Sequence, residues 1–274
     1  MPSIKQPDVK ATFNSKHRRD AKWRFAAGIV LFVAGIVLAD DAPDKIFAAR
    51  AEAEFHRAQI QFESNTNGSA AASQFARACY NFADFATNKT ERAAIADQGI
   101  AACRQLIARD TNSIAAHYYL GMNLGQLART KNLGALKIIR EMESEFKMAG
   151  ALDPLFDYAG PERNLGLLYR EAPGWPASIG SKRKARDWLE RALQLAPDYP
   201  ENHLNLIETF LQWHENGGAK NELKTLDALW PVAQKKLIGG KWEQSWEDWS
   251  ARRDAARETL NEVSASAKPP KNMR

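Results

Sequence analysis

The sequence has few of the residues that catalytic and metal sites require. Of its 274 residues, two are cysteines and five are histidines, and the histidines show no metal-ligand spacing. No glycine cluster ends in the Gly-Lys-Ser/Thr of a phosphate-binding loop, and no Gly-X-Ser-X-Gly elbow occurs. The sequence therefore predicts a protein that is not an enzyme, with no cofactor and no metal site.

The body of the chain also lacks a net charge. The first 39 residues hold seven basic and two acidic residues, whereas the remaining chain holds 31 of each. A domain that binds nucleic acid concentrates positive charge on its folded surface. We therefore expect no nucleic-acid partner, although the sequence pI is about 9.1.

Residues 1–39 have the order of parts found in an export signal. A basic stretch precedes an uncharged apolar run, Phe25 to Leu38, and Val37-Leu38-Ala39 forms a cleavage site ahead of Asp40-Asp41. This order is typical of a secretory signal peptide that is removed before Asp40. The alternative is an uncleaved anchor in the inner membrane through residues 25–39, a short run against the ~20 residues that span a bilayer.

Either interpretation of the leader predicts a periplasmic or secreted protein. We expect a helical domain over residues 40–263 and a disordered tail over residues 264–274, which is polar and contains proline. Contact with a membrane is expected only through residues 25–39, and only if the leader is not cleaved.

Beyond the leader, helical periodicity repeats. The clearest copy covers residues 160–197, where a first helix with large, small and large positions precedes a second helix with small, large and small positions. Three other segments have the same intervals. In chain order the matching positions are Cys79, Phe82, Ala83 and Ala86 with Gly99, Cys103 and Leu106; His117, Leu120, Gly121 and Leu124 with Met142, Phe146 and Ala149; Leu165, Gly166 and Tyr169 with Ala185, Leu189 and Ala192; and His203, Leu206, Ile207 and Phe210 with Ala219, Leu223 and Leu226.

These intervals, over residues 69–231, resemble those of the tetratricopeptide repeat (TPR) superfamily. The resemblance implies an all-α fold, an α-solenoid of stacked antiparallel helix pairs, with capping helices at residues 44–63 and 241–263. In that family the first helices line a concave groove that binds a protein or peptide. Carried onto this sequence, the groove positions include Tyr118, Met122, Gln126, Arg163, Leu167, Arg170, Glu171, Glu208 and Gln212.

A subset of the third copy also resembles TatT-type accessory proteins of TRAP transporters. The residues that carry this resemblance are Gly160-Pro161, Leu165-Gly166, Tyr169, Ala172-Pro173-Gly174, Gly180-Ser181, Lys184-Ala185 and Pro197. It implies the alternative function of an oligomeric carrier of small hydrophobic ligands in a transport system.

The third copy differs from the others by an insertion, Glu171 to Ser181. It contains Pro173, Gly174, Trp175 and Pro176, which predict a stiff, apolar surface loop. Loops of this kind carry function when a scaffold positions them. Two interpretations stay open, a binding site around Trp175 or a local cap on the groove edge.

The remaining candidate residues have a structural interpretation beside the functional one. Cys79 and Cys103 lie where an antiparallel pair brings two helix ends together, so they form either a disulfide or two buried thiols. His117 and His203 occupy the same repeat position, which favours structural histidines. Tryptophans at 242, 246 and 249 follow helical spacing, which favours a packed stripe over a binding surface.

Overall fold

The computed structural model describes residues 42–131 and 134–266 of the chain. Within them it contains α-helices and a 3-10 helix, and no strand. Their bounds are α1 Ala42–Ser64, α2 Ser69–Ala83, α3 Lys89–Ile107, α4 Ile114–Ala128, α5 Ala135–Leu152, α6 Phe156–Glu171, α7 Lys182–Leu195, α8 Pro200–Gln212, α9 Asn216–Lys236, η2 Gly240–Trp242 and α10 Glu243–Ser266.

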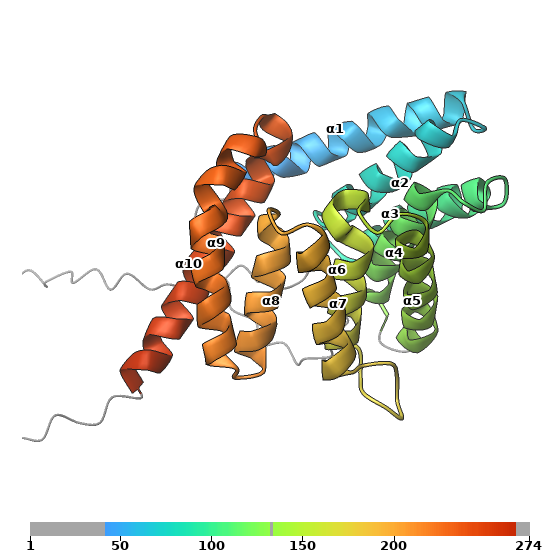
Figure 1. Ribbon diagram of the computed structural model, residues 1–274. Helices are drawn as coiled ribbons and strands as arrows, with labels where there is room; N and C mark the ends of the chain where they lie inside the picture. Colours follow the sequence, from blue (N-terminus) through green and yellow to red (C-terminus); the bar gives the residue numbers. More distant parts are fainter. Residues whose placement is uncertain (1–41, 132–133, 267–274) are drawn as a thin grey trace, which may run out of the picture.

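The helices stack as antiparallel pairs in chain order, α2 with α3, α4 with α5, α6 with α7 and α8 with α9 (Figure 1). Small residues permit the close approach within a pair. A Cβ added at Gly121 would lie 2.6 Å from the Phe146 ring, and one at Gly166 would lie 2.5 Å from Leu189. The predicted all-α solenoid is therefore confirmed, with its small and large positions facing one another.

The register predicted for the first pair was wrong. Cys79 lies ten residues after the start of α2, whereas His117 and His203 each lie three residues after the start of α4 and α8. Ala86, the last position of the predicted match, falls beyond the end of α2 at Ala83. The segment is rich in alanine, so small positions recur at many intervals and a shifted match looks as good as the true one.

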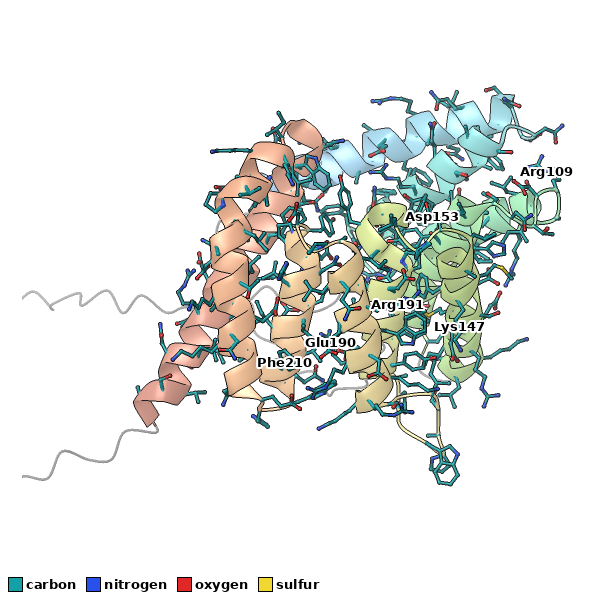
Figure 2. All side chains as sticks on the ribbon, viewed as in Figure 1. Arg109, Lys147, Asp153, Glu190, Arg191 and Phe210 are labelled. Atoms are coloured by element: carbon teal, nitrogen blue, oxygen red, sulfur yellow. The ribbon has the colours of Figure 1, made fainter. Side chains whose placement is uncertain are left out.

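Two aromatic caps close the ends of the stack. At one end α1 packs on α2 through Phe55 and Phe62, whose rings lie 5.6 and 5.3 Å from Phe75. At the other, Trp249 of α10 is fully buried, and Trp242 and Trp246 pack partly buried against the same core. The tryptophan stripe is thus a packing surface, as its spacing indicated. Side chains fill the spaces between the ribbons (Figure 2).

The structure contains no disulfide between Cys79 and Cys103. Cys79 and Cys103 are both free and buried. Burial raises the pKa of each thiol well above its ordinary value. The second alternative, two inert buried thiols, is the one that the structure has.

The two histidines are structural and make equivalent contacts. Nδ1 of His117 lies 2.6 Å from Glu145 Oε2, and its Nε2 lies 2.9 Å from the Thr111 carbonyl oxygen. His203 repeats this arrangement with Glu222 at 2.5 Å and the Pro197 carbonyl at 2.6 Å. Each ring therefore ties its first helix both to the paired helix and to the preceding turn.

Some predictions fall at the margins of the described residues. The leader, residues 1–39, lies outside them, so its export or anchoring role is untested. Among residues 42–131 and 134–266, no helix has the length and apolarity to cross a membrane. Helix α10 continues to Ser266, three residues further than the predicted end of the helical domain.

Candidate functional site

The concave face of the solenoid contains a cavity of about 490 Å³. Its wall comes from the first helices α2, α4, α6 and α8, and from the two caps α1 and α10 with η2. A cavity of this size is typical of sites that hold small ligands or short peptide segments. The site is therefore a groove that the caps partly cover, rather than the fully open groove expected from the repeats.

The partial cover over the cavity comes from α1. This helix runs from its packing on α2 across to the top of α9 and α10 (Figure 1). There Arg50 Nη1 contacts Glu243 Oε2 at 2.7 Å, and both side chains are 55% exposed. Four residues of α1 line the cavity: Phe47, Arg50, Ala51 and Glu54.

The wall is polar and aromatic. Ten lining residues are charged, eight are aromatic, and only Ala51, Met122 and Leu167 are aliphatic. The charged ones are six cations and four carboxylates: Arg50, Arg77, Arg163, Arg170, Lys241 and Arg252, with Glu54, Asp157, Glu201 and Glu208. Such a wall offers hydrogen bonds and aromatic faces, and little surface for an apolar ligand.

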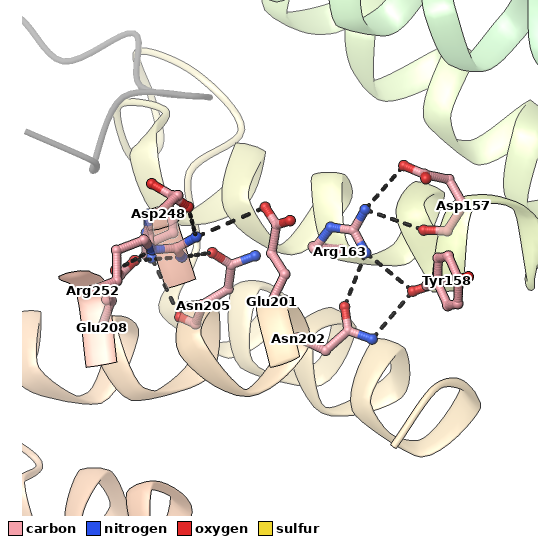
Figure 3. A network of polar contacts seen from close by, with 10 residues as sticks. Asp157, Tyr158, Arg163, Glu201, Asn202, Asn205, Glu208, Asp248 and Arg252 are labelled. Atoms are coloured by element: carbon pink, nitrogen blue, oxygen red, sulfur yellow. Dashed lines mark hydrogen bonds and ion pairs between the residues drawn. The ribbon is translucent and has the colours of Figure 1, made fainter. Parts of the chain in front are cut away.

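Arg163 holds one side of the wall together (Figure 3). Its Nη1 donates to the Tyr158 carbonyl oxygen at 3.1 Å and to Asn202 Oδ1 at 3.0 Å, and its Nη2 contacts Asp157 Oδ2 at 3.2 Å. Burial alone would lower the pKa of Arg163, but the charges of Glu201 and Asp157 outweigh it and hold the pKa above its ordinary value. The guanidinium is a fixed structural cation whose two terminal nitrogens already donate to groups of the wall.

The contacts of Arg163 stabilise an unusual turn. Asp157, Tyr158 and Ala159 all have left-handed backbone angles, with φ of 51°, 57° and 60°. Each such residue costs roughly 1–2 kcal/mol when it is not glycine. Tyr118 donates its hydroxyl to Asp157 Oδ2 at 2.5 Å, and burial raises the pKa of Tyr118 well above its ordinary value. The turn places Asp157 and Tyr158 on the cavity wall.

Arg252 is the second buried arginine of the wall, and its contacts join α10 to α8. Its Nε donates to Glu208 Oε1 at 2.8 Å, its Nη2 to Asn205 Oδ1 at 2.6 Å and its Nη1 to Asp248 Oδ2 at 3.2 Å. Figure 3 places Glu201 between the two arginines. Both buried cations are thus compensated by carboxylates of the wall.

An aromatic cluster adjoins the left-handed turn. The rings of Tyr158 and Tyr199 stack at 4.4 Å, and Trp242 meets Tyr158 edge-on at 5.8 Å. Tyr158 keeps 41% of its surface exposed. This cluster offers a flat aromatic surface to a ligand in the cavity.

Two cations of the wall are available to a ligand. Arg77 on α2 and Lys241 in η2 are exposed, and within the described part of the chain no carboxylate forms an ion pair with either. Glu54, on α1, is an exposed carboxylate of the same wall. The free groups therefore carry both signs of charge.

The predicted groove residues divide into two sets. Six of them line the cavity: Tyr118, Met122, Arg163, Leu167, Arg170 and Glu208. Four do not: Gln126, Glu171, Trp175 and Gln212. Their role in binding a partner stays a prediction for all ten.

The four outside the cavity have other environments. Gln126 is buried and donates to Asp84 Oδ1 at 2.8 Å. Glu171 accepts from Arg170 Nε at 2.6 Å. Gln212 is exposed at the end of α8, and Trp175 projects from the α6–α7 loop, away from the wall.

Sequence reasoning missed the contributions of α1, η2 and α10. Glu54, Lys241 and Trp242 belong to caps, which the repeat pattern describes only as ends of the stack. The one available signal was the run of polar and charged residues between the aromatic positions of these caps. Over residues 42–131 and 134–266, no group of three or more His, Cys, Asp and Glu side chains is arranged to hold a metal ion.

Comparison with known proteins supports the fold. No family model and no curated protein sequence matches the chain. Among solved structures, it is similar to a thermophilic TPR protein from Thermus thermophilus, with a TM-score of 0.54 and 19% identity over 79% of this chain and 95% of that one. The chain therefore has a TPR-like fold, and the comparison gives no support to the more specific resemblance to TatT-type proteins.

Proposed function

We propose that this protein is a non-catalytic scaffold that binds a short segment of a partner protein in the cavity of its concave face. The observation that supports it best is the wall itself, in which charged groups of both signs lie among aromatic rings, with Tyr158 exposed. Peptide segments present a polar backbone at every residue and a side chain of varied chemistry, which such a wall matches.

The proposal includes a location outside the cytoplasm. Its support is the leader sequence, in which basic residues precede the apolar run of residues 25–38. Under this proposal the partner is another protein of the periplasm, or of the outer face of the inner membrane.

The carrier alternative is less well supported. A carrier of hydrophobic ligands needs an apolar chamber, whereas only three aliphatic residues line this one and ten charged residues do. Trp175, in the insertion of the copy that carries this resemblance, does not line the cavity.

Photo-crosslinking tests the proposal. A photoreactive amino acid replaces Tyr158, which lines the cavity and is 41% exposed, or Val232, a residue of α9 that is 48% exposed and does not line it. We expect cells to yield one crosslinked protein from position 158, joined through a short segment, and none from position 232. Reversal of a free cation, Arg77→Glu, should reduce that crosslink at least several-fold. Because Arg77 is exposed, the variant should keep the fold.

Two results would contradict the proposal. Crosslinks of equal strength from positions 158 and 232 would mean that the cavity is not the binding surface. A small molecule that copurifies with the chain in native mass spectrometry, and is displaced by Arg77→Glu, would favour the carrier instead.

A further inference from the structure

We propose that a second surface, at the edge of the solenoid that carries the α6–α7 loop, docks onto an anionic lipid bilayer. We call this surface the loop edge. It consists of the loop tip and the first turns of the two helices beside it, and its members are Leu136, Lys137, Pro173, Trp175, Pro176, Ala177, Lys182, Arg183 and Lys184. None of these residues lines the cavity, so the inference is independent of the proposed function.

The tip of the loop is an exposed apolar surface. Trp175 is 89% exposed, the highest value among the exposed large hydrophobic residues, and Pro173, Pro176 and Ala177 beside it are exposed as well. No charged residue occurs from residue 172 to residue 181. Tryptophan is enriched at the membrane–water interface, where its ring is apolar and its N–H finds polar partners.

The backbone of the loop is held in place. The amide of Gly180 donates to the Pro173 carbonyl at 2.9 Å, and the amide of Ser181 donates to the Tyr169 carbonyl at 2.9 Å. The two sides of the loop are so close that a Cβ at Gly180 would lie 2.0 Å from the Ala172 oxygen. The tip is therefore presented in an ordered conformation, which reduces the entropy lost on docking.

Three exposed cations follow the loop directly. Lys182, Arg183 and Lys184 occupy the first turn of α7, where the helix dipole disfavours positive charge. In the described part of the chain the nearest ion pair is weak, with Arg183 Nη1 3.8 Å from Asp187. The ammonium groups of Lys182 and Lys184 lie 5.6 and 4.9 Å from the ring centroids of Trp213 and Tyr169. All three side chains stay exposed, so they can also meet a negatively charged surface.

The first turn of α5 extends the loop edge. Leu136 is 42% exposed and Lys137 is exposed beside it. Helix α5 lies against the base of the loop, because Ile139 and Met142 line one small pocket together with Glu171 and Ala172. The edge therefore has apolar side chains surrounded by cations, the combination that binds anionic headgroups and the interface beneath them.

A fluorescent probe at the tip tests the proposal on the full chain. The variant Ala177→Cys is labelled with the environment-sensitive dye NBD, which the two buried native cysteines do not take up in the folded protein. The matched control is Ala151→Cys, an exposed site at the other end of α5. Because the dye reports its own surroundings, the result does not depend on whether the leader also inserts into the vesicle.

We expect NBD emission at position 177 to rise and shift to the blue on vesicles of phosphatidylcholine with phosphatidylglycerol, and not on phosphatidylcholine alone. Higher salt should reverse the change. Replacing Lys182, Arg183 and Lys184 together by Gln should raise the lipid concentration at half-maximal signal by about 100-fold, since each surface cation contributes about fivefold. The matched triple Lys220→Gln, Lys224→Gln and Lys235→Gln should leave it unchanged.

Three outcomes would overturn the proposal. One is an unchanged signal at position 177 on anionic vesicles. Another is an equal signal at position 151, which would mean that the chain adsorbs without orientation. The third is an equal response of position 177 to soluble polyglutamate, which would assign the edge to an acidic protein partner instead.

Discussion

Arg50 and Glu243 are 193 residues apart in the chain, and their side chains meet at 2.7 Å where α1 reaches the start of α10. This contact links the two caps beside the cavity. It is also a weak closure, because both side chains are 55% exposed and exposed ion pairs contribute roughly 0.2–1 kcal/mol.

The first prediction concerns this closure. The variant Arg50→Glu should leave the melting temperature nearly unchanged and speed amide hydrogen exchange across residues 45–54 by up to about fivefold. The double variant Arg50→Glu with Glu243→Arg should restore the original rate, and Arg57→Glu on the same helix should not affect it. Exchange that is unaffected by Arg50→Glu would mean that packing alone holds α1 across the cavity.

The second prediction concerns Glu162, which is 1% exposed and whose Oε2 has no hydrogen-bond partner in the described residues. Burial raises its pKa from 4.5 to about 7, although Arg191 lies 3.7 Å away and partly offsets this. The folded state therefore holds this proton more tightly than the unfolded state. The resulting stability is complete below pH ~4.5 and is lost as the pH rises to ~7.

The test is Glu162→Gln, which has the same shape and no charge. We expect equal stability to the original protein at low pH, and a gain that grows to about 3 kcal/mol as the pH rises through 7. Urea unfolding at a series of pH values measures it, with the exposed Glu63→Gln as control. A difference that does not change with pH would show that the carboxyl group is not protonated in the fold.

The third prediction concerns the small positions of the repeat. A Cβ at Gly121 would lie 2.6 Å from Phe146, so Gly121→Ala should cost about 1–3 kcal/mol of unfolding free energy. Gly217 in α9 has open space around its Cβ position, and Gly217→Ala should be neutral or stabilising by up to ~1 kcal/mol. Thermal unfolding of the two variants compares them, and an equal effect would contradict the packing argument.

The fourth prediction concerns the thiols. Because burial raises the pKa of Cys79 and Cys103, the folded chain should react slowly with a thiol reagent over the neutral range. After unfolding in denaturant without reductant, two thiols per chain should react at the rate of exposed cysteine. Recovery of no thiol after unfolding would mean that the bridge forms in the native compartment.

Several features could be predicted from the sequence because they depend on neighbours in the chain. Gly166 and Leu189 belong to one helix pair, and their intervals recur in the next pair with Gly121 and Phe146. The roles of His203 and Trp249 followed in the same way, from a repeat position and a helical spacing. Alanine-rich α2 shows the limit, since its uniform small residues allowed the wrong register.

The candidate site was harder to predict from the sequence. The repeats predict which residues face the concave side, and six of the ten proposed groove residues do line the cavity. They do not predict the left-handed turn at Asp157, because no glycine marks it and the contacts that stabilise it come from Arg163, Tyr118 and Asn202. Nor do the repeats predict where Trp175 lies, because its loop is an insertion that projects from the edge of the solenoid.

The sequence by itself therefore determined the stack of helix pairs, since each pair depends on contacts between residues a few turns apart in neighbouring helices. Only the tertiary structure decided that the two caps partly cover the concave face. The meeting of Arg50 with Glu243 depends on the rotation that accumulates over four successive pairs, and no local pattern encodes that sum. The same accumulation separates the cavity from the loop edge and leaves the protein with two distinct surfaces.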